Sequence, residues 1–93
     1  MNFNEYQKLA LRTALNTSLI NGVMGLCGEA GEVIELVKKH EFQNKSLDKE
    51  KLLEELGDCL WYISLIANSL DTKLENVAIK NIEKLEKRYI LNN

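Results

Sequence analysis

The sequence predicts an all-α protein. None of its 93 residues is a proline, and no stretch alternates polar and apolar residues as an amphipathic β-strand would. Apolar residues instead recur every three or four positions, which places them on one face of an α-helix. Four such segments follow one another, so we expect four helices in a single domain that covers residues 1–93.

The first expected helix begins at Asn2 or Asn4, since either side chain can cap a helix N-terminus. Its apolar face extends over about four turns, and the polar segment 16–18 is expected to end it. The second expected helix has an apolar arc from Leu19 to Val37. Three cations, which suit a helix C-terminus, follow that arc: Lys38, Lys39 and His40.

A polar loop is expected over 41–48, and Ser46 or Asp48 is expected to cap a third helix over about 49–70. The second half of that helix is apolar around most of its circumference, which indicates that it is covered on nearly all sides. In so short a chain, we expect this cover to come from a second subunit.

The fourth expected helix opens with Thr72 and Glu75, whose spacing is the pattern of a capping box. Apolar residues line its inner face. Its other positions are polar or basic, and among them are Asn81, Lys84 and Arg88.

Two pairs of acidic residues lie in the second and third helices, namely Glu29 with Glu32 and Glu55 with Asp58. Each pair is spaced three residues apart, so both side chains share one helix face. On a helical wheel, Glu29 lies inside the apolar arc of its helix and Glu32 lies at the edge. Glu55 and Asp58 also lie on the apolar side of their helix. Because 22 residues separate the pairs, two antiparallel helices can bring the four carboxylates together.

Four carboxylates directed toward an interior repel one another and are costly to bury unless positive charge compensates them. A bound divalent cation is the simplest compensation. The four ligands are all oxygens, with no convergent histidine or cysteine. The sequence therefore predicts a site for Mg²⁺, with Mn²⁺ as a substitute, rather than for Zn²⁺.

Glycine recurs at every third position of the second helix, although each glycine costs about 1 kcal/mol relative to alanine. Two explanations stay open: close approach of a neighbouring helix, or space for a ligand beside the acids. The four positions are Gly22, Gly25, Gly28 and Gly31.

The composition excludes several other classes of protein. A formal net charge of −2 gives the chain no excess of basic residues with which to bind nucleic acid or an anionic membrane surface. The apolar run 60–67 is too short to span a bilayer, and the N-terminus lacks the pattern of a signal peptide. We therefore expect a cytoplasmic protein in which Cys27 and Cys59 are reduced core thiols.

Three segments in this order, GLCGEAGEVIELVKK, EELGDCLWYISLIA and NIEKLEKRY, resemble the MazG-like nucleoside triphosphate pyrophosphohydrolases of the all-α NTP pyrophosphatase superfamily. The resemblance extends from about Asn4 to Tyr89. It implies a four-helix protomer that pairs into a homodimer or a dimer of dimers. It also implies an Mg²⁺-dependent enzyme that cleaves a nucleoside or deoxynucleoside triphosphate to the monophosphate and pyrophosphate.

The signature of this family is two glutamates three apart, followed after a loop by Glu-x-x-Asp. The matching residues here, which the resemblance implies as metal ligands, are Glu29, Glu32, Glu55 and Asp58. We expect Glu29 and Glu32 to be catalytic as well, with Glu32 accepting the proton of the attacking water.

Phosphate contacts are expected from Lys38 and from three residues of the last helix, Asn81, Lys84 and Arg88, which match polar positions of the family. The alternative for Lys38 is a solvated helix end. Trp61 or Tyr62 is a candidate for stacking on the nucleobase, and packing in the core or at a dimer interface is the alternative for both.

Three functions are compatible with these residues. The first is a nucleoside triphosphate pyrophosphohydrolase, with cleaning of the nucleotide pool as a role. The second is an enzyme for one substrate, such as a dCTP or dUTP pyrophosphatase or the phosphoribosyl-ATP pyrophosphatase of histidine synthesis. The third is a non-catalytic helical dimer that binds a nucleotide or a protein. For the third we would expect one of the four acids to be replaced, and all four are present.

Overall fold

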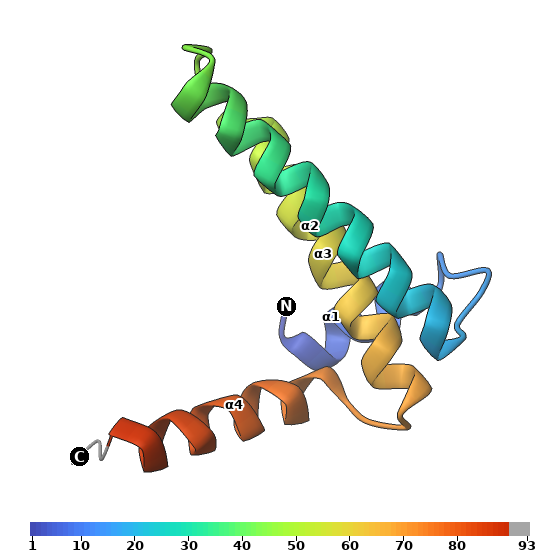
Figure 1. The fold of residues 1–93 in the computed structure, drawn as a ribbon. Helices are drawn as coiled ribbons and strands as arrows, with labels where there is room; N and C mark the ends of the chain where they lie inside the picture. The colour runs from blue at the N-terminus through green and yellow to red at the C-terminus, as the bar shows by residue number, and fades with distance from the viewer. Residues whose placement is uncertain (90–93) are drawn as a thin grey trace.

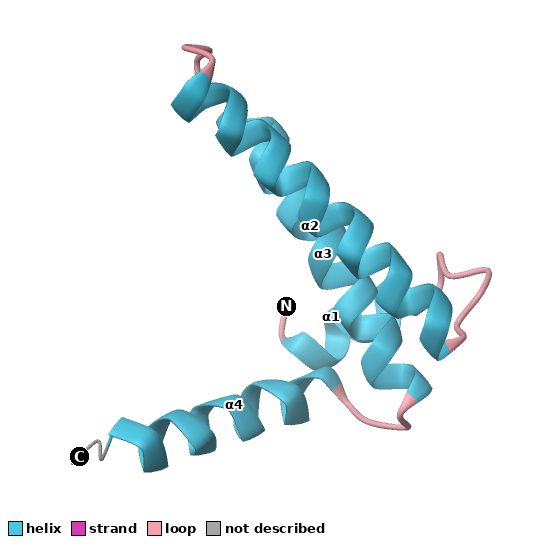
Figure 2. Cartoon of the chain, in the orientation of Figure 1, coloured by secondary structure: helices cyan, strands magenta, loops and turns pink. Residues whose placement is uncertain are grey.

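The computed structural model describes residues 1–89, and every regular element in that range is a helix (Figures 1 and 2). In chain order the helices are α1 (Phe3–Leu11), α2 (Leu19–Phe42), α3 (Lys49–Ser69) and α4 (Leu74–Tyr89). The predicted all-α class with four helices is therefore confirmed. None of these helices is both long enough and apolar enough to cross a membrane.

α2 and α3 form an antiparallel helical hairpin and lie side by side along most of their length (Figure 1). α1 packs against the α3 side of the hairpin. α4 contacts α1 and α3, but not α2, and runs away from the hairpin. The acidic pairs of α2 and α3 therefore lie on the two helices with the most extensive mutual contact.

The end of α1 differs from the expected four turns, because the helix has nine residues and ends at Leu11. The cause is competition for the Ala10 carbonyl oxygen. The Thr13 hydroxyl donates to this oxygen at 2.8 Å, and the indole N–H of Trp61 in α3 donates to it at 3.2 Å. The chain then leaves the helical path, and Leu15 is fully exposed rather than part of an apolar face.

Three helix starts are capped by side chains, and two of these caps, Asn2 and Asp48, are among those that the sequence predicts. Asn2 accepts from the Glu5 N–H at 2.9 Å, and Asp48 accepts from the Lys51 N–H at 3.1 Å. Ser18 caps α2 in the same way. These contacts confirm Asn2 and Asp48 within the pairs of alternatives that the sequence left open.

The capping box predicted from Thr72 is wrong. α4 begins at Leu74, so Thr72 lies too early in the chain, and its hydroxyl donates to the Leu70 carbonyl instead. The Leu74 N–H donates to the side-chain oxygen of Gln7 at 2.9 Å. A residue of α1 therefore takes the place of a local cap.

Gln7 connects three helices from a buried position. Its amide nitrogen donates to the Ser64 carbonyl at 3.3 Å and to the Thr72 carbonyl at 3.1 Å. Around it, helices of the same chain bury Ser64, Leu65 and Ala67 in the second half of α3. Other apolar residues of this half, such as Leu60 and Ile63, are only partly buried. Cover of this half by a second subunit therefore stays a prediction.

The glycines of α2 divide into two groups. A Cβ atom at Gly22 would lie 2.9 Å from Cγ1 of Ile66, and one at Gly25 would overlap the ring of Tyr62. At Gly28 and Gly31, a Cβ would meet no described atom within 4 Å. Close helix approach therefore explains the first two glycines and leaves the other two, which flank Glu29 and Glu32, beside open space.

The contact at Gly25 generates a stability prediction. The Tyr62 ring is held edge-on against Trp61, with 4.9 Å between ring centroids, so it has little freedom to move aside. We expect Gly25→Ala to destabilise the fold by about 1–3 kcal/mol through overpacking. Gly28→Ala, the matched control on the same helix, is expected to stabilise it by about 0.5–1 kcal/mol. Urea unfolding measures both changes, and equal effects would contradict the close packing at Gly25.

Candidate metal centre

Three carboxylates converge between α2 and α3, and we call them the acid cluster: Glu29 from α2, with Glu55 and Asp58 from α3. Their ligand atoms all lie within 4.8 Å of one another. Glu55 is 6 % exposed, Glu29 is half-buried and Asp58 is exposed. The cluster is therefore closed at Glu55 and open to solvent at Asp58.

Helix geometry explains this arrangement. Glu55 lies between Leu52 and Cys59, one turn away on either side, so it shares the face of α3 that packs on α2. Asp58 is one turn further along and rotated toward the edge of that face. Glu29 reaches the same space from α2, because Gly25, one turn before it, lets the two helices approach closely.

The fourth predicted ligand, Glu32, lies outside the acid cluster. Its side chain is exposed and lies one turn beyond Glu29 on α2. The helical wheel places Glu32 at the border of the apolar arc, and its exposure in the structure agrees with that placement.

The electrostatics of the acid cluster follow from this crowding. The pKa of Glu29 is raised, first by its hydrogen bond with Glu55, then by desolvation and by the negative charges of Asp58, Glu55 and Glu32. The crowded carboxylates therefore favour positive charge brought to the acid cluster.

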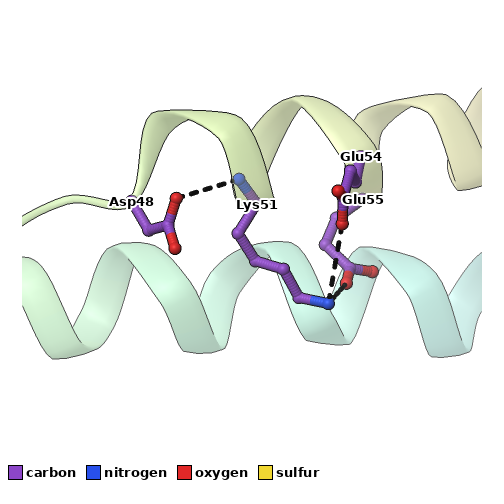
Figure 3. Close-up of polar contacts among 4 residues, drawn as sticks. All are labelled: Asp48, Lys51, Glu54 and Glu55. Atoms are coloured by element: carbon purple, nitrogen blue, oxygen red, sulfur yellow. Dashed lines mark hydrogen bonds and ion pairs between the residues drawn. The ribbon is translucent and has the colours of Figure 1, made fainter.

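Lys51 supplies further positive charge (Figure 3). Its ammonium lies 3.3 Å from Glu55 Oε1 and 3.9 Å from Glu54 Oε2. The hydrogen bond with Glu55 and the nearby carboxylates raise the pKa of Lys51, so the side chain stays charged. Our sequence reasoning did not single out Lys51, although its position four residues before Glu55 is the spacing of a helical ion pair.

Two more side chains border the acid cluster and were also missed as neighbours of the site. Burial, and then the charge of Asp58, raise the pKa of the Tyr6 phenol in α1. Burial, and then the charges of the three clustered acids, raise the pKa of the half-buried Cys59 thiol. Cys27 is exposed, so the prediction of a core thiol is wrong for that residue.

The aromatic candidates for base stacking pack inside the protomer. The Trp61 indole donates to Thr13 Oγ1 at 2.9 Å as well as to the Ala10 carbonyl, which fixes the ring against α1. Tyr62 stands at 85° to Trp61 and covers Gly25. These contacts are those of the packing alternative, and base stacking stays a prediction.

Within one protomer, the polar and basic residues that the sequence predicts to bind phosphate lie away from the acid cluster. Lys38 is about 180° around α2 from Glu29, and its ammonium pairs with Glu35 at 3.3 Å. The other three residues are exposed on α4, which does not contact α2: Asn81, Lys84 and Arg88.

The chemistry of the acid cluster fits a hard divalent cation. Within the described residues, all its ligand atoms are carboxylate oxygens, with no imidazole or thiolate among them. Mg²⁺ and Mn²⁺ prefer such ligands, and Mg²⁺ is typically held by one or two carboxylates together with water and substrate phosphates. The side of the acid cluster at Asp58 is exposed to solvent, which leaves room for water and phosphate ligands.

This helical hairpin places clustered carboxylates on facing helices. The same arrangement is found in a class of all-α proteins that bind metal through carboxylates. The family model of the MazG nucleotide pyrophosphohydrolase domain matches residues 18–90, which include both acidic pairs and most of the chain. The chain belongs to this family. The description of this family is that of a nucleotide pyrophosphohydrolase domain.

The chain is also similar to two curated proteins. The chain is 41 % identical over 69 residues to the Gene 37 protein of Mycobacterium phage L5, an alignment that covers 70 % of this chain and 60 % of the relative. It is 32 % identical over 73 residues to the uncharacterized protein YvdC of Bacillus subtilis (strain 168), covering 69 % of each chain. The chain thus spans less than two thirds of the length of the phage protein. No solved structure matches the chain.

The raised pKa of Glu29 predicts how stability depends on pH without metal. Between the ordinary carboxyl pKa and the raised one, the folded chain binds more protons than the unfolded chain. The melting temperature should therefore fall as pH rises through this interval and stay lower above it.

Glu29→Gln should remove this fall, so that in EDTA at neutral pH the variant melts above the wild-type chain. Thermal melts across pH measure the effect, with Glu86→Gln, an exposed position on α4, as the control. A wild-type melting temperature that rises through the interval, with no response to Glu29→Gln, would contradict the crowding of these carboxylates.

Proposed function

We propose that this protein is an Mg²⁺-dependent nucleoside triphosphate pyrophosphohydrolase, which cleaves a nucleoside or deoxynucleoside triphosphate to the monophosphate and pyrophosphate. Cleaning of the nucleotide pool is the role that we assign to it. The observation that carries the proposal is the acid cluster, because it lies in the MazG-matching segment and its oxygens suit the metal that phosphoanhydride hydrolysis needs.

In this mechanism Glu29, Glu55 and Asp58 would hold Mg²⁺, with Mn²⁺ as a substitute, and Glu32 would complete the ligand set from one turn further along α2. Bound Mg²⁺ supplies charge neutralisation of the phosphate oxygens and lowers the pKa of coordinated water. Glu32, exposed one turn from Glu29, accepts the proton of the attacking water, and Glu29 orients that water. The water oxygen would bond to the α-phosphorus, the α–β anhydride bond would break, and pyrophosphate would leave.

The remaining predicted contacts extend this proposal to a second protomer. Because α4 and α2 of one chain do not touch, we assign Asn81, Lys84 and Arg88 to phosphates bound at the acid cluster of a partner subunit. Lys38 is assigned to the same partner-facing role. Trp61 and Tyr62 then shape the floor of the base site through their packing.

Substitution of the metal ligands tests the enzymatic proposal. Asp58→Asn and Glu55→Gln each remove a ligand charge and should lower kcat/KM by about a thousandfold, which corresponds to several kcal/mol of transition-state stabilisation. The assay is pyrophosphate release from a panel of canonical, modified and deoxynucleoside triphosphates with Mg²⁺. Glu86→Gln is the control, and circular dichroism checks the fold.

Unchanged turnover in both ligand variants would remove the acid cluster from the mechanism. Binding of nucleotides with no turnover of any panel member by the wild-type chain would favour the non-catalytic dimer instead.

The shape of the protomer supports assembly into a homodimer or a dimer of dimers. Its accessible surface of 7208 Å² exceeds by about 1,700 Å² the surface expected of a compact chain of this mass. Its radius of gyration is 15.7 Å, against about 12 Å for a compact domain of this length. A stable dimer buries roughly 800 Å² on each partner, so one such interface would cover about half of the excess and two, as in a dimer of dimers, would cover nearly all of it.

A seam on the outer face of α2 is the surface that we assign to this pairing. Ile20, Met24 and Ile34 are 66 %, 67 % and 58 % exposed, on the side of α2 opposite α3. The seam consists of Ile20, Met24, Cys27, Gly31 and Ile34. Their alternating spacing of four and three is that of a coiled-coil seam, and Cys27 and Gly31 are small enough for close helix approach.

Met24→Glu tests the seam, because a buried charge at the centre of a helix contact opposes association. We expect the variant to elute at the mass of one protomer in size-exclusion chromatography with light scattering, while the wild-type chain elutes at twice or four times that mass. Lys39→Glu, which changes charge on α2 away from the seam, is the control and should leave the assembly intact. A wild-type monomer, or a Met24→Glu oligomer of unchanged mass, would overturn this assignment.

A further inference from the structure

A cavity, which we call the α1 hollow, lies where α1 meets α3 and the start of α4 (Figure 1). Its volume is about 420 Å³, which is within the range of about 300–1,000 Å³ that is usual for sites that bind small molecules. Its lining residues are Met1, Asn2, Phe3, Tyr6, Leu60 and Glu75.

Tyr6 connects the α1 hollow with the acid cluster. This residue lines the hollow, while burial, and then the charge of Asp58, raise the pKa of its phenol. Asp58 is the member of the acid cluster that is exposed to solvent, so the hollow lies near the side from which phosphates can approach. A nucleotide with its phosphates at the acid cluster can therefore extend its base into the hollow.

The walls of the α1 hollow are mostly apolar. Phe3 and Leu60 line it from α1 and α3, and Phe3 is 47 % exposed. Trp61 keeps α1 in place, because its indole donates to both Ala10 and Thr13. A nucleobase can stack on an exposed aromatic ring, but stacking does not distinguish one base from another. Selection among bases therefore requires a polar group in the hollow.

Glu75 supplies that polar group. Its Oε2 accepts from the Asn4 amide at 3.1 Å, which fixes the direction of the carboxylate, and its Oε1 accepts no hydrogen bond from residues 1–89. The Asn2 side chain, by contrast, already exchanges two hydrogen bonds with Glu5. An ionised carboxylate accepts hydrogen bonds and donates none, so Glu75 favours a base whose edge carries a donor.

We propose that the α1 hollow binds the nucleobase and that Glu75 selects bases with an exocyclic amino group, cytosine and adenine, over uracil and hypoxanthine, which have a carbonyl there. This inference rests on the proposed function and deepens it, because it names the class of base that the enzyme prefers. A carbonyl oxygen beside Glu75 Oε1 would place two acceptors together with no proton between them, and such an unpaired contact rejects the wrong base.

The structural alternative is that Glu75 only secures α4 to α1 through Asn4. Glu75→Gln separates the two roles, because the amide oxygen of glutamine can still accept from Asn4. A purely structural Glu75 would leave the preference among bases unchanged in this variant. A Glu75 that contacts the base would lose the preference, since an amide both donates and accepts.

Two pairs of nucleotides isolate the amino group in the test: CTP with UTP, and ATP with ITP, each in its ribose and deoxyribose form. Pyrophosphate release in Mg²⁺ gives kcat and KM for the full wild-type chain, Glu75→Gln and Phe3→Ala. Glu86→Gln, which changes an exposed glutamate further along α4, is the matched control, and circular dichroism checks the fold.

We expect the wild-type chain to favour the amino-bearing member of each pair by about tenfold or more in kcat/KM, as one charge-assisted hydrogen bond provides. The difference should lie in KM rather than in kcat, because the base makes the same contact before and during the reaction. Glu75→Gln should bring both ratios close to one. Phe3→Ala should raise KM for all the nucleotides and keep the preference, and Glu86→Gln should match the wild-type chain.

Two kinds of result would overturn the inference, and they are distinguishable. If the wild-type chain hydrolyses both members of each pair equally, or if Glu75→Gln keeps the preference, Glu75 does not select the base and the proposed function stands. If the wild-type chain hydrolyses none of these nucleotides, the proposed function and the assignment of the α1 hollow fail together.

Discussion

The structure depends on one electrostatic constraint: the Glu55 carboxylate is buried between two helices that also bring Glu29 and Asp58 to it. Negative charge in such a place must be offset by a proton, a side-chain cation or a metal. In the free chain the crowding raises the pKa of Glu29, and the Lys51 ammonium lies 3.3 Å from Glu55. A divalent ion carries twice the charge of one ammonium, and this difference is the basis of the metal affinity that we propose.

The rest of the fold maintains this arrangement. Gly22 and Gly25 allow α2 to lie close to α3, and the Tyr62 ring fills the space that they leave. Trp61, hydrogen-bonded to α1, holds that ring in place. Gln7 in turn secures α1 to the end of α3 and the start of α4. The packing of α3 against α2 and α1 therefore determines where its acids lie.

Much of the fold could be predicted from residue spacing alone, since helix periodicity and the caps at Asn2 and Asp48 are local properties. The position of the acids on their helix faces also predicted that three of them converge, once the two helices are antiparallel. Other tertiary contacts could not be predicted. Trp61, which lies 51 residues from Ala10 in the chain, donates to the carbonyl at the end of α1, and Gln7 rather than a capping box satisfies the start of α4. Lys51 carried a local signal, and its importance follows only from the burial of Glu55.

Anomalous diffraction from a crystal of the protein grown with Mn²⁺ tests the central claim most directly, because it locates the metal without reference to activity. The account predicts a strong anomalous peak coordinated by carboxylate oxygens of Glu29, Glu55 and Asp58. Ordered density for these side chains with no anomalous peak between them would contradict it.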